Sequence, residues 1–222
     1  MGTEIDKFVR SRRRTIALIV ERDCSLTVRA PMRAPLAEIE SFVHDHQEWI
    51  ERTRERMRLT PVVPEKQFMD GEKFHFLGRE YELRIVDSQR TALKFNGGFS
   101  LSRGAQRRGR AVFERWYKSQ AARILTERVE RLANQGGYEP RQVRITSART
   151  RWGSCSPDGT LNFSWRLVQA PLEVIDYVAL HELAHLRIRS HSRRFWKLVE
   201  QHCPDFRLRR KWLREFGDKF WM

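Results

Sequence analysis

The chain has 222 residues, of which 40% are hydrophobic, and its formal charge is +15 at pH 7. This length allows one full hydrophobic core, with or without a smaller appended subdomain. The three scattered cysteines argue against a small protein held together by disulfides. The longest apolar run near the N-terminus, Ile16 to Val20, is too short for a membrane-spanning helix. The charged N-terminus lacks the pattern of a signal peptide, so we expect a cytoplasmic protein with no membrane association.

Basic side chains occur in both halves of the chain, with denser patches at Arg103–Arg110, Arg141–Arg151 and Arg207–Arg214. Such patches are typical of a solvated surface or of a surface that binds a nucleic acid or another polyanion. The composition leaves both interpretations open.

The first half of the chain is predicted to form a β-hairpin, a helix and two further hairpins. The periodicity and turn residues predict strands at Thr15–Val20, Ser25–Ala30, Lys73–Phe76, Glu80–Val86, Ala92–Phe95 and Phe99–Ser102. A single helix is expected from Leu36 to about Arg56, followed by a linker at Pro61 and Pro64. The segment Arg103–Arg110, with two glycines and no acid, is expected to be a mobile basic loop. We place a domain boundary there, between residues 1–105 and 106–222.

The second half is predicted to be mainly helical, with two strands that we expect to be antiparallel. The strands are Val143–Ser147 and Thr160–Trp165, and the helices run from Ala111 to about Asn134, from Pro171 onward, from Arg193 to about Cys203, and from Pro204 to Phe216.

The helix that begins at Pro171 carries the sequence His181-Glu182-Leu183-Ala184-His185. Two histidines four residues apart project from one face of a helix, so their ring nitrogens can converge on one metal ion. Glu182 stands beside the first histidine, where it can hold a metal-bound water and take its proton. This arrangement is typical of the helix half of a zinc hydrolase site.

A third ligand must come from beyond this helix. Continuing the helix would rotate His191 roughly 240° away from His185, so we expect a turn near Arg189 and Ser190 to bring His191 back.

Three later residues compete with His191 for this role. Glu200 lies on a different face of the following helix, and His202 lies in its last turn, where the helix dipole favours a histidine without any metal. Asp205 follows Pro204 and serves the start of the final helix. We therefore prefer His191.

These motifs resemble the YgjP-like metal-dependent hydrolases, which are relatives of the WLM and SprT-like zincin metallopeptidases. The resemblance is carried by residues 181–196, HELAHLRIRSHSRRFW, and by residues 149–167, RTRWGSCSPDGTLNFSWRL. The arginine-rich N-terminal hairpin, the hairpin at residues 71–83 and the long central helix agree with it, so it covers nearly the whole chain.

The resemblance implies an α+β fold with a zincin-like core, in which a small antiparallel sheet packs on helices, together with an N-terminal hairpin and helix subdomain. It implies one Zn²⁺ per chain held by His181, His185 and His191, with Glu182 as general base. In zincins an edge strand above the metal pairs with an extended substrate, and we expect Leu161–Trp165 to be that strand. The candidate substrate-binding residues are Arg151, Trp152, Ser154, Asn162, Phe163 and Ser164.

We therefore expect a zinc metallopeptidase that acts on a peptide or protein, with Arg151 or Arg187 as the cation that stabilises the oxyanion. One alternative is a metal-dependent nucleotide phosphohydrolase of the pyrophosphatase type, which would suit the excess of arginine. Another is a DNA-associated metalloprotease that the basic patches hold on nucleic acid. A purely structural zinc module agrees less well, because such sites are closed by four ligands and need no adjacent glutamate.

Overall fold

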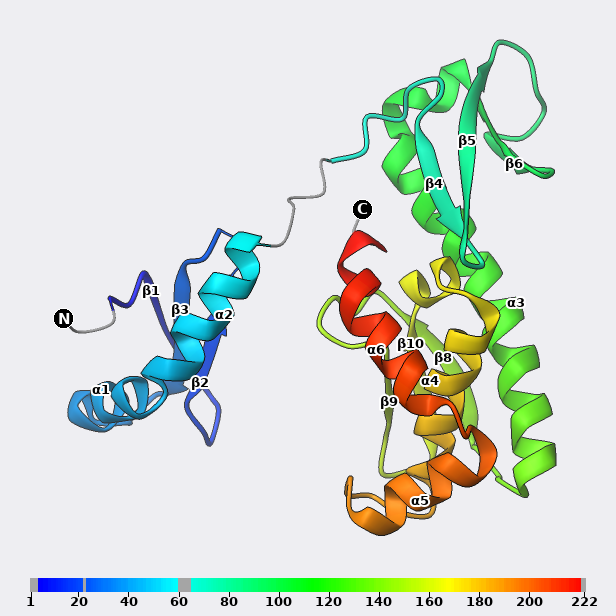
Figure 1. The fold of residues 1–222 in the computed structure, drawn as a ribbon. Helices are drawn as coiled ribbons and strands as arrows, with labels where there is room; N and C mark the ends of the chain where they lie inside the picture. Colours follow the sequence, from blue (N-terminus) through cyan, green and yellow to red (C-terminus); the bar gives the residue numbers. More distant parts are fainter. Residues whose placement is uncertain (1–3, 22, 60–64, 221–222) are drawn as a thin grey trace. The chain divides into compact units, whose positions relative to one another are not determined.

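A computed structural model of the chain describes residues 4–21, 23–59 and 65–220 (Figure 1). The chain divides into two units, Met1–Val63 and Pro64–Met222, which are described one at a time. The expected domain boundary near residue 105 therefore lies inside the second unit. The predicted linker at Pro61 and Pro64 lies outside the described residues.

The first unit is a three-stranded sheet with two helices. Its elements are β1 (Lys7–Ser11), β2 (Ala17–Val20), β3 (Leu26–Pro31), α1 (Leu36–Asp45) and α2 (Gln47–Leu59). The sheet order is β1-β3-β2, with β3 parallel to β1 and antiparallel to β2, so the predicted hairpin is confirmed and β1 is additional. Leu26 and Val28 of β3 are completely buried against Ile39 and Ile50 of the helices.

The prediction of a single helix from Leu36 to Arg56 is wrong, because the helix is interrupted at His46. The His46 ring bonds through Nδ1 to the carbonyl oxygen of Phe42, at 2.8 Å, and the His46 backbone leaves the helical region there. A side chain that bonds the backbone of the preceding turn competes with helix continuation.

The second unit begins with a four-stranded sheet packed on a long helix. The strands are β4 (Lys73–Phe76), β5 (Arg79–Val86), β6 (Leu93–Phe95) and β7 (Phe99–Ser102), in the order β4-β5-β7-β6. Both predicted hairpins are present, and β5 and β7 join them in parallel. Phe74 of β4 stacks on Phe113 of α3 (Gly109–Gly136) with ring centroids 4.1 Å apart. These strands thus share one core with α3.

The expected mobile loop at Arg103–Arg110 is wrong. Residues Arg103–Arg108 form a 3₁₀ helix that leads directly into α3, and Ala105 is buried. Gly109, the first residue of α3, allows the backbone to pack closely against Phe68, because a Cβ at this position would lie 2.3 Å from the Phe68 ring. The glycine that suggests flexibility in the sequence is needed here for close packing.

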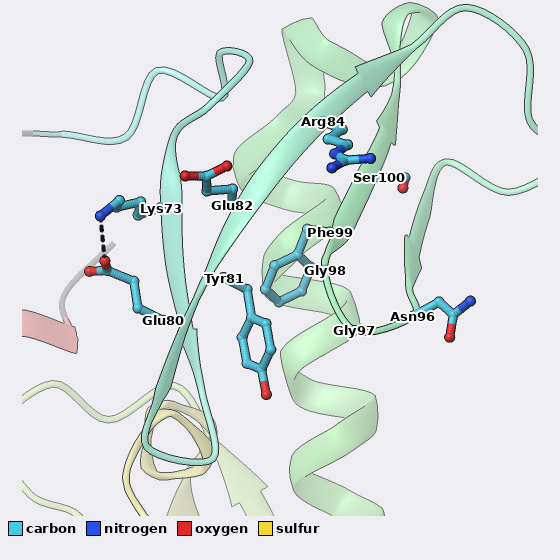
Figure 2. A pocket seen from close by; sticks show the side chains of 10 residues that line it. All are labelled: Lys73, Glu80, Tyr81, Glu82, Arg84, Asn96, Gly97, Gly98, Phe99 and Ser100. Carbon is cyan, nitrogen blue, oxygen red and sulfur yellow. Dashed lines mark ion pairs between the residues drawn. The ribbon is translucent and has the colours of Figure 1, made fainter.

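Residues of β4, β5 and the β6–β7 hairpin line a hollow of about 500 Å³ (Figure 2). Its two carboxylates, Glu80 and Glu82, are balanced by Lys73 and Arg84, and the Lys73 ammonium lies 2.9 Å from the Glu80 carboxylate. This hollow therefore has no excess of charge to select a charged ligand.

The rest of the second unit combines a three-stranded sheet with three helices. Its elements are β8 (Gln142–Thr146), β9 (Gly153–Cys155), β10 (Thr160–Ser164), the 3₁₀ helix Trp165–Gln169, α4 (Leu172–Ala184), α5 (Arg193–His202), α6 (Phe206–Phe216) and the 3₁₀ helix Gly217–Phe220. Small sheets packed on helices confirm the α+β, zincin-like fold class, although all three sheets are mixed rather than antiparallel. No helix among the described residues is long and apolar enough to cross a membrane.

Two expectations about this last sheet are wrong. The strand order is β8-β10-β9, so β10, which contains most of Leu161–Trp165, is the central strand and not the edge. β10 also runs parallel to β8, because β9 lies between them in the chain and the turn at Pro157-Asp158-Gly159 reverses β9 into β10. The two edge strands are β8 and β9.

Candidate metal centre

Helix α4 positions two of the three candidate ligands, His181 and His185, which are both half-buried. Pro171 precedes the first turn, and aliphatic residues such as Val174, Val178 and Leu183 are buried along the helix. His181 lies within its last turn, and His185 follows as the C-cap residue with helical dihedral angles. The two rings therefore lie on successive turns of one face, with centroids 5.0 Å apart.

His191 returns to this pair through a tight corner. After α4 the amides of Leu186 and Arg187 bond to the carbonyls of Leu183 and Ala184, at 3.0 and 3.1 Å, and end the helix. Arg189 fixes the corner from outside, since its guanidinium donates to the carbonyl of Pro157 at 2.8 Å.

As a result, the Nε2 atoms of His191 and His181 are 3.0 Å apart. One nitrogen from each of His181, His185 and His191 lies within 4.8 Å of the others. The structure therefore brings together the three histidines that the sequence analysis selected.

The three competing residues are engaged elsewhere. Glu200 is paired with Arg207 at 2.6 Å, and the His202 ring lies beside Tyr138 at 6.0 Å. Asp205 accepts a bond from the Cys203 thiol at 3.3 Å and pairs with Arg209. Among the described residues, these side chains do not join the histidine cluster.

The protonation of the cluster suits a cation. Burial, together with neighbouring His185, His191 and Arg210, lowers the pKa of His181 to about 3, so its ring is neutral at pH 7. Burial also lowers the pKa of His185, and its Nδ1 bonds to the carbonyl of Ile188 at 3.1 Å, which leaves Nε2 free to coordinate. Imidazole nitrogens are ligands that zinc prefers, and the donor set of three histidines therefore fits this metal.

Aromatic side chains surround the cluster. The Phe195 ring stacks on His185 at 4.5 Å, and the Trp196 ring stacks on His191 at 5.7 Å, so α5 closes one side of the site. Apolar side chains of this kind lower the local dielectric and so strengthen electrostatic interactions at a metal.

Glu182 is buried beside the cluster, with 6% of its surface exposed. Burial raises the pKa of its carboxyl group to about 7, and the charge of Arg151 acts in the opposite direction. Gly153 of β9 lies directly over this carboxyl: a Cβ on Gly153 would lie 2.6 Å from Oε1. Only a residue without a side chain leaves room for Glu182 at this point. Gly153 lies between the predicted substrate-binding residues Trp152 and Ser154, and its place in RWGSC is its only signal in the sequence.

The six candidate substrate-binding residues separate into two groups. Asn162, Phe163 and Ser164 lie on the central strand β10: Phe163 and Ser164 are buried, and Asn162 donates to the Ser156 hydroxyl at 3.1 Å. The Ser164 hydroxyl donates to the carbonyl of Ala148 at 2.8 Å. These contacts brace the sheet.

Arg151, Trp152 and Ser154 lie on or next to the edge strand. Arg151 is exposed and acts on Glu182, whereas the half-buried Trp152 packs over Gly217, where a Cβ would be 2.8 Å from its ring. Arg187, the other candidate cation, instead donates to the carbonyls of Gly136 and Gly137, both at 2.8 Å, and so braces the end of α3.

Comparison with known proteins agrees with this geometry. A family model described as YgjP-like, metallopeptidase domain, matches residues 14–216. The chain belongs to the YgjP-like family. This YgjP-like chain is accordingly a metal-dependent hydrolase.

Two further comparisons add little to this assignment. A solved structure, the metallopeptidase zymogen of Pyrococcus abyssi abylysin, is 26% identical, with a TM-score of 0.34, over 39% of this chain and 93% of its own. No curated protein matches the chain significantly.

Proposed function

We propose that this YgjP-like chain is a zinc metallopeptidase in which His181, His185 and His191 hold one Zn²⁺ and Glu182 is the general base. The observation that carries the proposal is the convergence of three imidazole nitrogens within 4.8 Å beside a buried carboxyl group. A structural zinc site would have no use for such a carboxyl, whose burial is costly.

Zinc held by the three imidazoles would supply an electrophilic centre that acidifies water and polarises a substrate carbonyl. Glu182 contributes the proton transfers: its carboxylate takes a proton from the attacking water and then gives it to the leaving amine. Burial raises the pKa of this group to about 7 in the metal-free protein, and a bound zinc ion would favour the ionised carboxylate that accepts the proton.

The edge strand β9 offers a place for an extended substrate. Trp152 and Ser156 bond to β10 through their backbone, the Trp152 carbonyl at 2.9 Å and the Ser156 amide at 2.8 Å. Backbone groups alternate in direction along a strand, so those of Gly153 and Cys155 face the open edge. A peptide that pairs there as an added strand would lie next to the Glu182 carboxyl, which touches Gly153.

The test compares the zinc-loaded parent with Glu182→Gln on an unfolded protein, a peptide library and a panel of nucleotides. We expect peptide-bond cleavage by the parent and a loss of about 10²–10⁴-fold in the variant at unchanged zinc content. Cleavage that survives in Glu182→Gln would overturn the role of the glutamate. Release of phosphate or diphosphate from nucleotides, with no peptide cleaved, would replace the peptidase with a phosphohydrolase.

A further inference from the structure

Helices α5 and α6 form a groove of about 760 Å³ whose lining is strongly basic. The cations that line it are Arg193, Lys197, Arg207, Arg210, Lys211 and Arg214, against one carboxylate, Glu200. The groove contains most of the third basic patch of the sequence, Arg207–Arg214, so folding joins that patch to cations of a second helix.

Much of this charge is not neutralised within the protein. Glu200 pairs with Arg207 at 2.6 Å, and Lys211 pairs with Glu215 at 3.7 Å. Arg193, Lys197 and Arg210, by contrast, pair with no carboxylate among the side chains that the structure describes. Clustered cations without partners repel one another, so an anionic ligand would be favoured here.

The groove adjoins the metal centre through Trp196. Trp196 lines the groove and also stacks on His191, with ring centroids 5.7 Å apart. The Arg210 guanidinium lies over the same Trp196 ring, 5.0 Å from its centroid, and Arg193 follows His191 by two residues. A ligand in the groove would therefore lie beside the reacting part of a substrate.

Two observations favour an acidic peptide over a nucleic acid. Nucleic-acid grooves commonly offer aromatic faces on which bases stack, whereas Trp196 already stacks on Phe206 at 5.3 Å and lies under Arg210. Glu200 also interrupts the cations, which disfavours a continuous phosphate backbone but leaves room for separate carboxylates.

We propose that this groove binds acidic side chains on one side of the scissile bond, so that the enzyme selects peptides with a run of Asp or Glu beside the cleaved bond. The proposal rests on the proposed peptidase function, and it names the substrate class of the same site. Rim charges of this kind act mainly on the encounter and on KM, because they lie outside the reacting centre.

The test measures binding separately from cleavage. Zinc-loaded Glu182→Gln protein is titrated, with fluorescence anisotropy, against three labelled probes: a peptide with a run of glutamates, the same peptide with glutamines, and a single-stranded oligonucleotide. The groove variant is Arg193→Glu/Lys197→Glu in this background. The matched control is Arg115→Glu/Arg194→Glu, which makes the same change of charge at exposed positions that do not line the groove.

We expect the glutamate peptide to bind more tightly than the glutamine peptide, and the groove variant to lose about tenfold in affinity for the glutamate peptide alone. The control should retain most of that affinity. In the active background, the groove variant should raise KM for the glutamate peptide and leave kcat nearly unchanged.

Equal affinity for the two peptides, equal loss in the groove and control variants, or tightest binding of the oligonucleotide would each overturn the proposal. If the groove binds the glutamate peptide but the parent cleaves no peptide, the proposed function fails and the binding site stands.

Discussion

The burial of Glu182 can be tested through stability, without any assay of turnover. Because burial raises the pKa of this carboxyl group from 4.5 to about 7, the folded protein binds a proton that the unfolded chain has already lost between these values. The carboxyl group therefore contributes stability that is fully present below about pH 4.5 and is lost as pH rises through 7.

The magnitude follows from the pKa shift. Each unit is worth about 1.4 kcal/mol, so above pH 8 the ionised Glu182 lowers the free energy of unfolding of the metal-free protein by about 3 kcal/mol. Glu182→Gln removes this charge and nearly preserves the shape of the side chain. We expect the variant to gain about 3 kcal/mol over the parent between pH 4.5 and pH 8.5, starting from a small difference at the acidic end.

The assay is equilibrium urea unfolding of parent and variant across this pH range in the presence of a chelator. His181, whose pKa is lowered to about 3, makes both proteins less stable as pH falls below 6.5, but this effect cancels in the difference between them. Added zinc should shrink the difference, because a nearby cation favours the ionised carboxylate of the parent. A difference that stays constant across the pH range would refute the effect of burial on Glu182.

Three further predictions concern the ligands, the edge strand and the two units. His191→Ala should weaken zinc binding as strongly as His185→Ala, while Glu200→Gln and His202→Ala leave it nearly unchanged; competition with a zinc-binding dye measures all four, and parental affinity in His191→Ala would remove this residue from the site. Gly153→Ala should lower kcat/KM by about 10²-fold, because the new Cβ must displace the Glu182 carboxyl group. The zinc content of the variant should stay at the parental level, and an unchanged kcat/KM would contradict the close contact. A chain of residues 64–222 should fold, bind zinc and unfold in one cooperative transition, because its core shares no residue with that of the first unit. Loss of the cooperative transition in circular dichroism would contradict this.

The helix and its histidines could be predicted because they depend on local periodicity. Apolar residues at helical spacing place His181 and His185 on one face, and six further residues cannot continue the helix and still bring His191 back. The helix ends at Ala184, earlier than the turn expected near Arg189 and Ser190, but the chain does turn back to bring His191 to the pair. How the corner is held could not be predicted, since the bond from Arg189 to Pro157 joins segments 32 residues apart.

The directions of the strands β8 and β10 could not be predicted from the sequence, for a different reason. Alternation along Thr160–Ser164 shows which face of a strand is buried, but it says nothing about the direction of the neighbouring strand. The antiparallel expectation for β8 and β10 ignored Gly153–Cys155, a segment of three residues that is too short for a period-two signal to be recognised. Once these residues form a strand, the reversal at Pro157-Asp158-Gly159 makes β10 parallel to β8.

This short strand also connects the fold to the proposed chemistry. The large and polar residues of RWGSC suggest substrate contacts, yet Trp152 packs on Gly217, and Gly153 is the residue that lies against Glu182. A larger residue at 153 would displace the Glu182 carboxyl group and expose it to water. Water would lower the pKa of Glu182 toward its ordinary value and weaken it as a base at neutral pH. A glycine on the edge strand thus sets both the position and the basicity of the glutamate that we propose as the general base.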